Sequence, residues 1–348
     1  MSEAGTARRR PALGMAGALG VGALLLAACG GRSPGSARSI TLYSGQHVQT
    51  TQLLIAGFER KTGITVNARY ADEDVLADQI VTEGSHSPAD VFFSENSPPL
   101  EYLASQGLLA RVDPSTLTRT PARFDPPGGK WVGISARVSV MVYNTLLLKP
   151  AQLPRSVMDL VRPQWNGKVA IAGTETDFQP IVMSVLRAHG TAAALRWLGA
   201  LRSNAGNHDY PNSETVADQV NRGQVAVGLV DQYYWYRERA QSGRSQMHSA
   251  IAYFAPRDVG YVLDVSGVGI LRSSTRQADA QRFVAFVNSA QGQQIIAHSD
   301  SFEYPVASGV TTAQPETPLA ELRPNAITIS ELGTGAAAIK LLQEAQLL

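Results

Sequence analysis

Short apolar segments alternate with amphipathic helical segments in the part of the chain that follows residue 39. Strands are predicted at residues 40–43, 64–68 and 90–93, because each is a short apolar run bounded by turn residues. Helices are predicted between these strands, where apolar residues recur at helical spacing, and Gly107 is placed to end the third helix. This β-α-β-α-β-α order is typical of a parallel sheet covered by helices, so we expect an α/β fold.

The rest of the chain continues the same pattern. Further strands are predicted at residues 131–134, 138–143, 169–172 and 225–230. Ser213 is placed to cap a helix, and the Gly- and Pro-containing segments 126–129 and 265–269 are candidate crossings between two lobes. The predicted lobes comprise residues 40–138 with about 266–315, and residues 139–265 with about 316–348.

Length and charge limit what such a protein can do. The chain has 348 residues, of which 44% are hydrophobic, which is enough for a sizeable core and suggests two domains. Its formal net charge is +1, so there is no basic field to attract nucleic acid, and no nucleic-acid partner is expected. Cys29 is the single cysteine, which excludes an internal disulfide and a metal site built from several thiolates.

The N-terminus has the features of a secretory signal peptide. Three arginines at residues 8–10 supply positive charge, and residues 12–28 form an uncharged segment rich in Ala, Gly and Leu. Cys29 follows at once, as in the lipobox of bacterial lipoproteins, so residues 1–28 are predicted to be removed and Cys29 to be lipidated. A lone cysteine can instead be a small buried hydrophobic residue. Residues 29–39 are predicted to be a flexible tether.

This leader predicts where the protein is found. We expect an exported protein that is lipid-anchored to the outer face of the cytoplasmic membrane or lies in the periplasm. The arginine run leaves both the general secretory route and the twin-arginine route open.

Aromatic residues follow the predicted strand 225–230, in the sequence Asp-Gln-Tyr-Tyr-Trp-Tyr at 231–236. Tyr233 and Tyr234 would place two phenol oxygens at the edge of the sheet where open α/β sheets bind ligands, and hard cations prefer oxygen donors. His47 and Glu95 are further donors that follow predicted strands. Alternatively, the aromatic run begins an amphipathic helix and packs in the core.

Five short segments carry a resemblance to a known family. They are residues 43–47 (YSGQH), 88–95 (PADVFFSE), 165–168 (WNGK), 233–236 (YYWY) and 303–305 (EYP). In order and spacing, the chain resembles the periplasmic ferric-ion-binding proteins of bacterial iron ABC transporters, from Ile40 to the C-terminus. The resemblance implies a two-lobed type 2 periplasmic-binding-protein fold, with a ligand cleft between the lobes and a hinge. It also implies a monomer that captures Fe(III), delivers it to an ABC permease and catalyses no reaction.

The family resemblance implies four iron ligands. His47 would supply an imidazole nitrogen, Glu95 a carboxylate, and Tyr233 and Tyr234 two phenolates. The three anionic ligands would neutralise Fe(III), and the tyrosine protons would have to leave, so affinity is expected to fall in acid. One lobe would contribute His47 and Glu95 and the other the two tyrosines, which would let the metal hold the cleft closed.

The resemblance also implies a synergistic anion such as carbonate beside the iron. The turn at Glu175, Thr176 and Asp177 is where family members hold such an anion, but its two acidic residues would repel it. The other residues assigned to the anion or to its surroundings are Arg137, Asn212 and Asp231. Arg137 could hold a carbonate with two hydrogen bonds, or Asp177 or Asp231 could fill the open coordination position instead.

Other functions are weighed against iron capture. The same fold could carry an organic ligand, such as a polyamine or a phosphonate, and the acidic residues favour a cation within that set. An enzyme is disfavoured, because the sequence has no Gly-x-Ser-x-Gly elbow between a predicted strand and helix, no His-Glu-x-x-His and no catalytic thiol.

Overall fold

The computed structural model describes residues 38–312 and 317–348, which fall in a single compact unit. The predicted signal peptide, the lipidation site Cys29 and most of the predicted tether lie outside the described residues. Among the helices that are described, none has the length and apolar character needed to cross a membrane.

The first half of the sheet is built as predicted. Strand β1 (Ser39–Ser44) pairs in parallel with β2 (Thr65–Tyr70) on one side and with β3 (Val91–Ser94) on the other. The helices that alternate with these strands are α1 (Val48–Thr62), α2 (Glu73–Glu83) and α3 (Ser97–Ser105). Gly107 has φ +70°, as expected of a residue that ends a helix. We call this half, with the helices that cover it, the β1 side.

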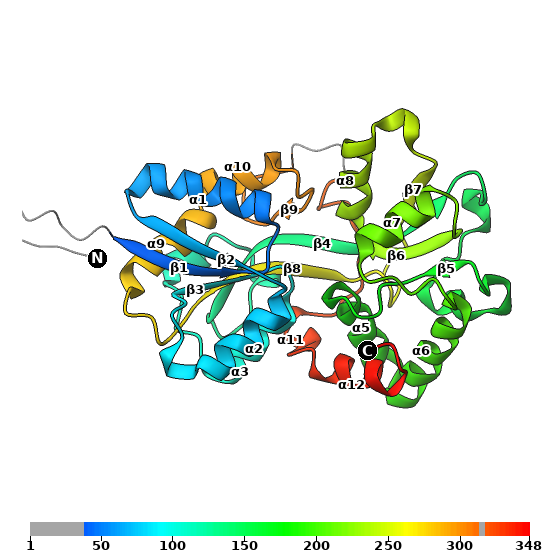
Figure 1. Ribbon diagram of the computed structural model, residues 1–348, viewed down its shortest axis with the longest axis horizontal. Coiled ribbons are helices and arrows are strands. Elements are labelled where there is room, and N and C mark those ends of the chain that lie inside the picture. The colour runs from blue at the N-terminus through cyan, green and yellow to red at the C-terminus, as the bar shows by residue number, and fades with distance from the viewer. Residues whose placement is uncertain (1–37, 313–316) are drawn as a thin grey trace, which may run out of the picture. The chain divides into compact units, whose positions relative to one another are not determined.

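Strand β4 (Trp131–Asn144) is longer than predicted. The sequence indicates two strands, 131–134 and 138–143, but the chain runs through both as one fully buried strand, with a register shift between Gly133 and Ser135. Residues 126–129 form a turn before it, so that part of the crossing prediction is wrong. The second segment, 265–269, lies inside β8 (Leu263–Ile270), which pairs with β4 and runs between the two halves of the sheet (Figure 1).

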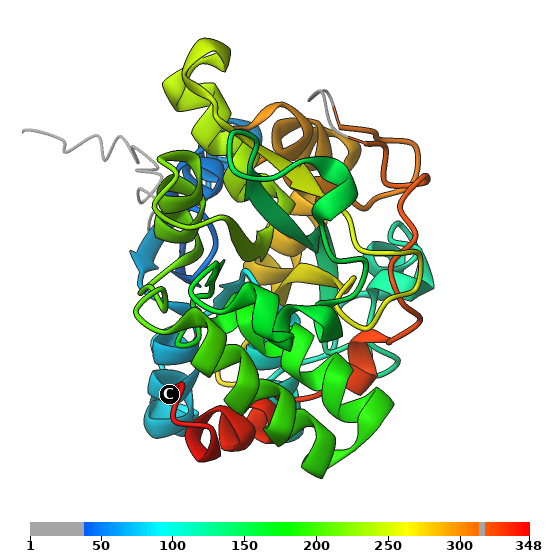
Figure 2. The same cartoon turned by 90° about the vertical axis from the view of Figure 1, so that its right-hand side faces the viewer.

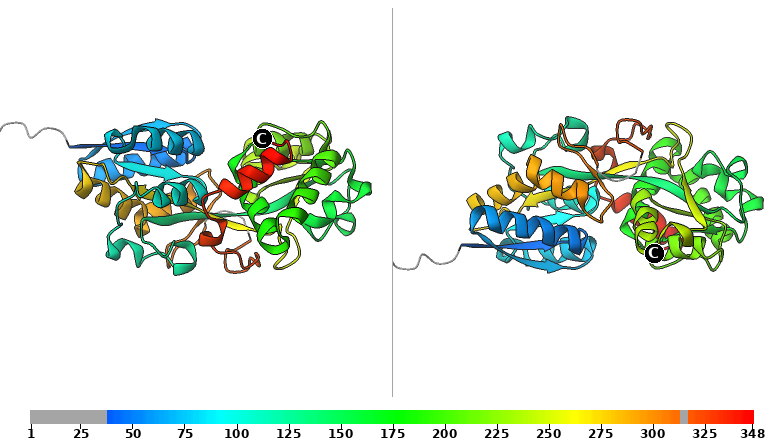
Figure 3. Two further views of the ribbon diagram at one scale, coloured as in Figure 1. Left: turned by 90° about the horizontal axis from the view of Figure 1, so that it is seen from below. Right: turned by 90° about the horizontal axis from the view of Figure 1, so that it is seen from above.

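The other half of the sheet lies around β6 (Val227–Asp231), which pairs antiparallel with β4 and parallel with β5 (Val169–Ala170). Strand β7 (Ser249–Ala252) pairs with β4 beside them. The strand order along the sheet is β2-β1-β3-β8-β4-β6-β5, and β7 and β9 (Tyr304–Pro305) pair with β4 off this path. We call this half the β6 side, and Figure 3 shows it and the β1 side in two further views, with strands running between them.

Helices cover both halves. The β6 side carries α5 (Gln179–His189), α6 (Thr191–Ala205), α7 (Ser213–Asn221) and α8 (Gln232–Ser242). The C-terminal α12 (Ala336–Glu344) packs against α5 and α6, as Figure 2 shows. On the β1 side, α9 (Gln277–Val287) and α10 (Ala290–His298) pack against α1. Shorter elements are α4 (Pro114–Leu117), β9 (Tyr304–Pro305) and α11 (Ile329–Leu332).

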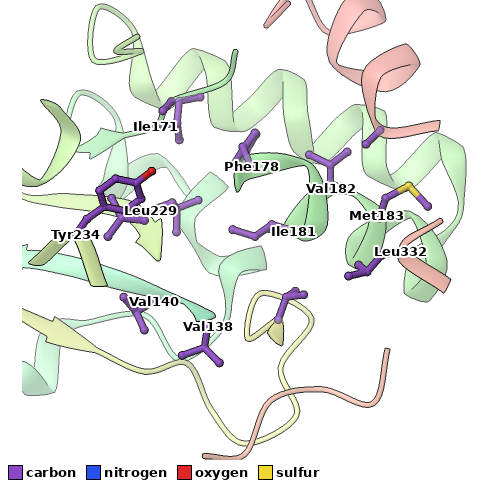
Figure 4. Packing of buried hydrophobic residues seen from close by; sticks show 14 of the residues in the cluster. Val138, Val140, Ile171, Phe178, Ile181, Val182, Met183, Leu229, Tyr234 and Leu332 are labelled. Atoms are coloured by element: carbon purple, nitrogen blue, oxygen red, sulfur yellow. The ribbon is translucent and has the colours of Figure 1, made fainter. Parts of the chain in front are cut away.

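The hydrophobic core forms two clusters. One lies on the β1 side, where Phe58 of α1 stacks edge-on against Phe283 of α9. The larger cluster extends through the β6 side, and Figure 4 shows Leu229, Ile181 and Tyr234 among its members. The ring of Tyr234 therefore contributes to packing, while its hydroxyl is the atom available for other chemistry.

Candidate metal centre

His47 and Glu95 follow two neighbouring parallel strands, β1 and β3: Glu95 comes directly after β3, and His47 precedes the first residue of α1 after a short turn. Because parallel strands end at the same edge of a sheet, the two side chains are brought together from positions far apart in the sequence. Gly45 permits the turn after β1, since a Cβ atom there would lie 2.5 Å from the Cβ of Glu73. Glu73 in turn accepts hydrogen bonds from the backbone N–H groups of Glu95 and Asn96.

Tyr233 and Tyr234 lie in the first turn of α8, immediately after β6. Both rings are buried, with 0% and 7% of their surface exposed. The two interpretations of the aromatic run therefore each hold in part, because the residues begin a helix and pack in the core, while their hydroxyls remain at the strand edge. A helix N-terminus also favours negative charge, which suits phenolates.

The four predicted ligand residues lie together. The hydroxyl of Tyr233 donates to Glu95 Oε1 at 2.6 Å, and His47 Nε2 lies 3.3 Å from the same oxygen. The His47 ring is 5.0 Å from that of Tyr233, whose ring is 4.1 Å from that of Tyr234. His47 Nε2 is buried and has no hydrogen-bond partner within the described chain. A buried nitrogen without a partner, beside three oxygen donors, suits a bound cation.

Two acidic residues from the turn before α5 complete the cluster. Both tyrosine hydroxyls donate to Asp177 Oδ2, at 2.9 Å for Tyr233 and 2.8 Å for Tyr234. Tyr234 also donates to Glu175 Oε1 at 3.1 Å, while Glu175 Oε2 accepts from the backbone N–H and the hydroxyl of Ser213. The cluster therefore contains more carboxylates than the four-ligand set requires.

Arg137, on β4, is fully buried beneath this cluster. Its guanidinium donates to Glu303, to Ser266 Oγ at 2.6 Å and to Asn96 Oδ1 at 2.9 Å. It also donates to the backbone carbonyl of Glu95 and lies 4.0 Å from Asp231 Oδ2. Arg137 is thus the positive charge that compensates the buried acids around it.

Glu303 is the site residue that the sequence analysis missed. One of its carboxylate oxygens, a ring nitrogen of His47 and a carboxylate oxygen of Glu95 all lie within 4.8 Å of one another, so the three residues form a possible ligand group. However, its oxygens already accept hydrogen bonds from the side chains of Arg137, Ser266, Ser135 and Gln46. We therefore assign it as the partner of Arg137. The EYP segment at 303–305 was the only sequence signal.

The remaining predicted residues have other contacts. Asn212 caps α7, because its side-chain oxygen accepts from the N–H of Thr215 at 2.8 Å; the sequence analysis had placed this cap at Ser213. Thr176 donates to Asp74 Oδ2 at 3.1 Å, across to the β1 side. Asp231 is buried next to Arg137. Of these three, only Asp231 lies beside Arg137, and none contacts the tyrosine hydroxyls.

Burial and mutual repulsion shift the pKa values in the cluster. Burial, with the charge of Asp177, raises the pKa of Glu95 and of Glu175 to about 8. The same causes raise the pKa of Tyr233 and of Tyr234 well above the usual range. Burial lowers the pKa of His47 to about 4, which leaves its imidazole neutral and able to bind a metal at neutral pH. All these shifts disfavour the charged forms, as burial and neighbouring like charges do, and such clusters of shifted groups are common at functional sites.

A cavity of about 410 Å³ opens onto the cluster, and its lining includes His47, Glu95, Glu175 and Tyr234. A larger cavity of about 910 Å³ lies between residues 111–129 and 324–330, away from these side chains. The smaller of these two cavities is therefore the one lined by the candidate ligands.

Comparison with known proteins identifies the family. The model of the bacterial extracellular solute-binding protein family matches residues 86–326. A Fe(3+)-binding periplasmic protein of Serratia marcescens is 36% identical over 324 residues, covering 93% of this chain and 95% of that protein. A major ferric iron-binding protein of Neisseria meningitidis is 34% identical, covering 93% and 97%. The chain belongs to the periplasmic ferric-ion-binding family of solute-binding proteins.

Solved structures agree with this family and its fold. Iron-bound HitA from Pseudomonas aeruginosa is 37% identical, has a TM-score of 0.84 and covers 88% of this chain and 99% of its own. A Trichodesmium protein described as being in complex with iron and citrate is 28% identical, with a TM-score of 0.77 and 89% and 100% coverage. The predicted type 2 solute-binding fold of this ferric-ion-binding family member is confirmed.

Proposed function

We propose that this protein captures Fe(III) between its β1 side and its β6 side and delivers the ion to an ABC-type transporter in the cytoplasmic membrane. The observation that carries the proposal is the convergence of His47, Glu95, Tyr233 and Tyr234 on one point from three separate places in the fold. Relatives named as ferric-iron-binding proteins, and a solved neighbour described as iron-bound, support the same cargo.

The chemistry of the side chains supports a trivalent cation. Two phenolates and a carboxylate are hard donors, and together they balance the charge of Fe(III). In the metal-free protein the two hydroxyls keep their protons and donate to carboxylates. Iron would displace these protons, so capture is coupled to proton release.

The arrangement of the sheet supports capture by closure. His47 and Glu95 belong to the β1 side, and the tyrosines to the β6 side. Strands β4 and β8 run between the two sides and would form the hinge. In this proposal the lobes are residues 40–138 with about 266–315, and residues 139–265 with about 316–348.

The same proposal covers export and partners. The protein would be exported, cleaved before Cys29 and held at the outer face of the membrane by lipid on that residue, acting as a monomer. Its partner would be an ABC permease, as expected for a solute-binding protein of this family. Mass spectrometry of the N-terminal peptide from membranes of the native cells tests the anchor.

Visible absorption tests the cargo directly. Adding Fe(III) to the purified protein is expected to give an orange or red colour from tyrosinate-to-iron charge transfer, and Tyr234→Phe is expected to weaken it. Tyr236→Phe is the matched control, because it removes a hydroxyl from another buried tyrosine of the same helix, whose ring stacks on Phe302. A colourless wild-type protein at saturating iron would contradict the proposal.

A polyamine is the second candidate, since its positive charges fit the carboxylates that line the cavity. Calorimetry with spermidine distinguishes the two cargoes. Tight binding of spermidine without any iron colour would replace the iron proposal.

A further inference from the structure

Asp177 occupies a special position among the acids of the site. Its Oδ2 accepts hydrogen bonds from both tyrosines, at 2.9 and 2.8 Å, and Tyr233 also donates to Glu95 at 2.6 Å. In octahedral sites of small hard cations, with ligands at about 2.0–2.1 Å, neighbouring ligand oxygens lie roughly 2.9 Å apart. The hydrogen-bonded oxygens therefore already have the spacing of neighbouring ligands around one ion.

The other oxygen of Asp177 is held by the β1 side. Asn96 donates from Nδ2 to Asp177 Oδ1 at 2.6 Å. Asn96 is itself fixed, because Nδ2 also donates to Glu73 Oε1 at 2.8 Å and its Oδ1 accepts from Arg137 at 2.9 Å. This arrangement turns a single oxygen, Oδ2, towards the tyrosines and keeps the carboxylate from rotating.

An added anion finds no favourable position beside Asp177. A cavity of about 430 Å³ adjoins it, and the described residues of its lining include six carboxylates but no Lys or Arg. These carboxylates are Asp72, Glu73, Asp74, Glu95, Glu175 and Asp177. The candidate anion holder, Arg137, already uses both terminal nitrogens for protein acceptors, and its Nε, which has no hydrogen-bond partner in the described chain, lies 4.0 Å from the carboxylate of Asp231. Once iron has displaced the protons from these acids, like charges would therefore repel a carbonate, a phosphate or an anionic chelator.

We propose that Asp177 is a built-in fifth ligand of the iron, oriented by Asn96, so that loading requires no external anion. This inference rests on the proposed function and deepens it. The buried, unpartnered Nε2 of His47 and the three oxygens of Glu95, Tyr233 and Tyr234 supply the other four positions. With Asp177 the protein supplies four anionic ligands to a trivalent ion, one more than charge balance needs. The preferred cargo is therefore the hydrated Fe(III) ion without a chelator, and negatively charged iron chelates are excluded.

The test compares iron binding with and without an anion. Apo-protein in decarbonated, phosphate-free buffer is titrated with freshly dissolved ferric chloride, and the titration is repeated with bicarbonate and with phosphate. The wild-type protein is expected to bind iron with the same affinity and to develop the same colour in all three titrations. A tenfold or greater gain in affinity from either anion would overturn the proposal. No colour under any condition would instead refute the proposed function, so the two failures are distinguishable.

Variants identify the residue responsible. Asp177→Asn is expected to lower iron affinity by more than about 100-fold, shift the charge-transfer band and make binding depend on bicarbonate, because a position becomes open. Asn96→Ala is expected to cost about 10–100-fold, the usual effect of losing a residue that orients a ligand. Asp72→Asn is the matched control, since this exposed acid lines the same cavity but makes no contact with the tyrosines. Wild-type affinity and spectrum in Asp177→Asn would overturn the assignment.

Discussion

Two buried charge clusters lie next to each other in this protein, and they differ in how completely their groups are paired. Around Arg137 and Glu303, both oxygens of the carboxylate and both terminal nitrogens of the guanidinium have hydrogen-bond partners. Within the described chain, carboxylates accumulate around the tyrosines without a Lys or Arg side chain hydrogen-bonded to them, and the buried Nε2 of His47 has no hydrogen-bond partner. Of the described groups in the first cluster, only Arg137 Nε lacks a hydrogen-bond partner and the opposite charges are paired, whereas the second cluster gathers like charges and suits a bound cation.

The largest loss of stability is expected when the cluster around Arg137 and Glu303 loses its arginine. Arg137→Met would leave Glu303 buried without its charge partner, and removing one member of a buried ion pair costs about 3–5 kcal/mol. Urea denaturation of the apo-protein measures this loss. The double variant Arg137→Met/Glu303→Gln is expected to lose less than the single variant, because Glu303 no longer carries a charge that lacks its partner. Equal or greater loss in the double variant would show that Arg137 acts through packing rather than through charge.

In the cluster around the tyrosines, a substitution is expected to weaken iron binding and to leave the stability of the apo-protein unchanged. Tyr234→Phe removes a ligand oxygen but no packing volume, so iron affinity is expected to fall by at least about 100-fold. The apo-protein is expected to keep its thermal stability, since the hydroxyl only joins an already crowded group of carboxylates. Iron titration and a melting curve measure the two effects. A large loss of stability together with unchanged affinity would reverse the assignment of the two clusters.

Gly45→Ala tests the turn that connects the clusters. The added methyl group would lie 2.5 Å from the Cβ of Glu73 and 2.7 Å from its Cα, so Glu73 would have to move away from Glu95 and Asn96. We expect a loss of about 1–3 kcal/mol, typical of overpacking, together with weaker iron binding. Gly199→Ala, in α6, is the control, because nothing lies within 4 Å of the added atom. Equal stability of the two variants would contradict this role for Gly45.

The smallest effect concerns pH. Glu95 and Glu175 have pKa values of about 8 in the folded protein, against about 4.3 when unfolded, so the native state holds more protons between these values. The melting temperature of the apo-protein is therefore expected to fall as pH rises towards 8. His47, with its pKa lowered to about 4, has the opposite effect only below about pH 6.5. Opening of the site would admit water to the carboxylates and limit the change.

Differential scanning calorimetry between pH 6.5 and 8 isolates the carboxylates from His47. The iron-loaded protein is expected to show a flatter profile, because the metal keeps its ligands deprotonated throughout. Parallel slopes with and without iron would mean that these carboxylates do not face the metal.

The sequence predicts well what depends on strand ends. The sequence predicts that His47, Glu95 and the tyrosine pair follow short apolar strands, and the structure places them just after β1, β3 and β6, at one edge of the sheet. Their role as iron ligands stays a prediction. The parallel β1-β2-β3 half follows from the same periodicity. These features are local in the sequence, and the regular geometry of a sheet then brings the strand ends together.

Pairings between distant residues could not be predicted in this way. Glu303 pairs with Arg137 across 166 positions, and Asn96 with Asp177 across 81, so no spacing or periodicity records either contact. The sequence predicts two strands in place of β4 because Ser135 and Arg137 interrupt the apolar run, and only burial against Glu303 explains a charged residue there. The cap at Asn212 was missed because the adjacent Ser213 is an equally good capping residue by type.

The position of Arg137 in β4 has a mechanical consequence. Strand β4 changes partner from β8 to β6 between Val138 and Ser139, one residue beyond Arg137. In the proposed closure, the charge of an arriving ion would act beside the pivot. A rotation of a few degrees there would move the far ends of the β1 side and the β6 side the most. A transporter that contacts the far ends of both sides could distinguish the iron-loaded protein from the metal-free protein by the distance between those ends, without contacting the iron.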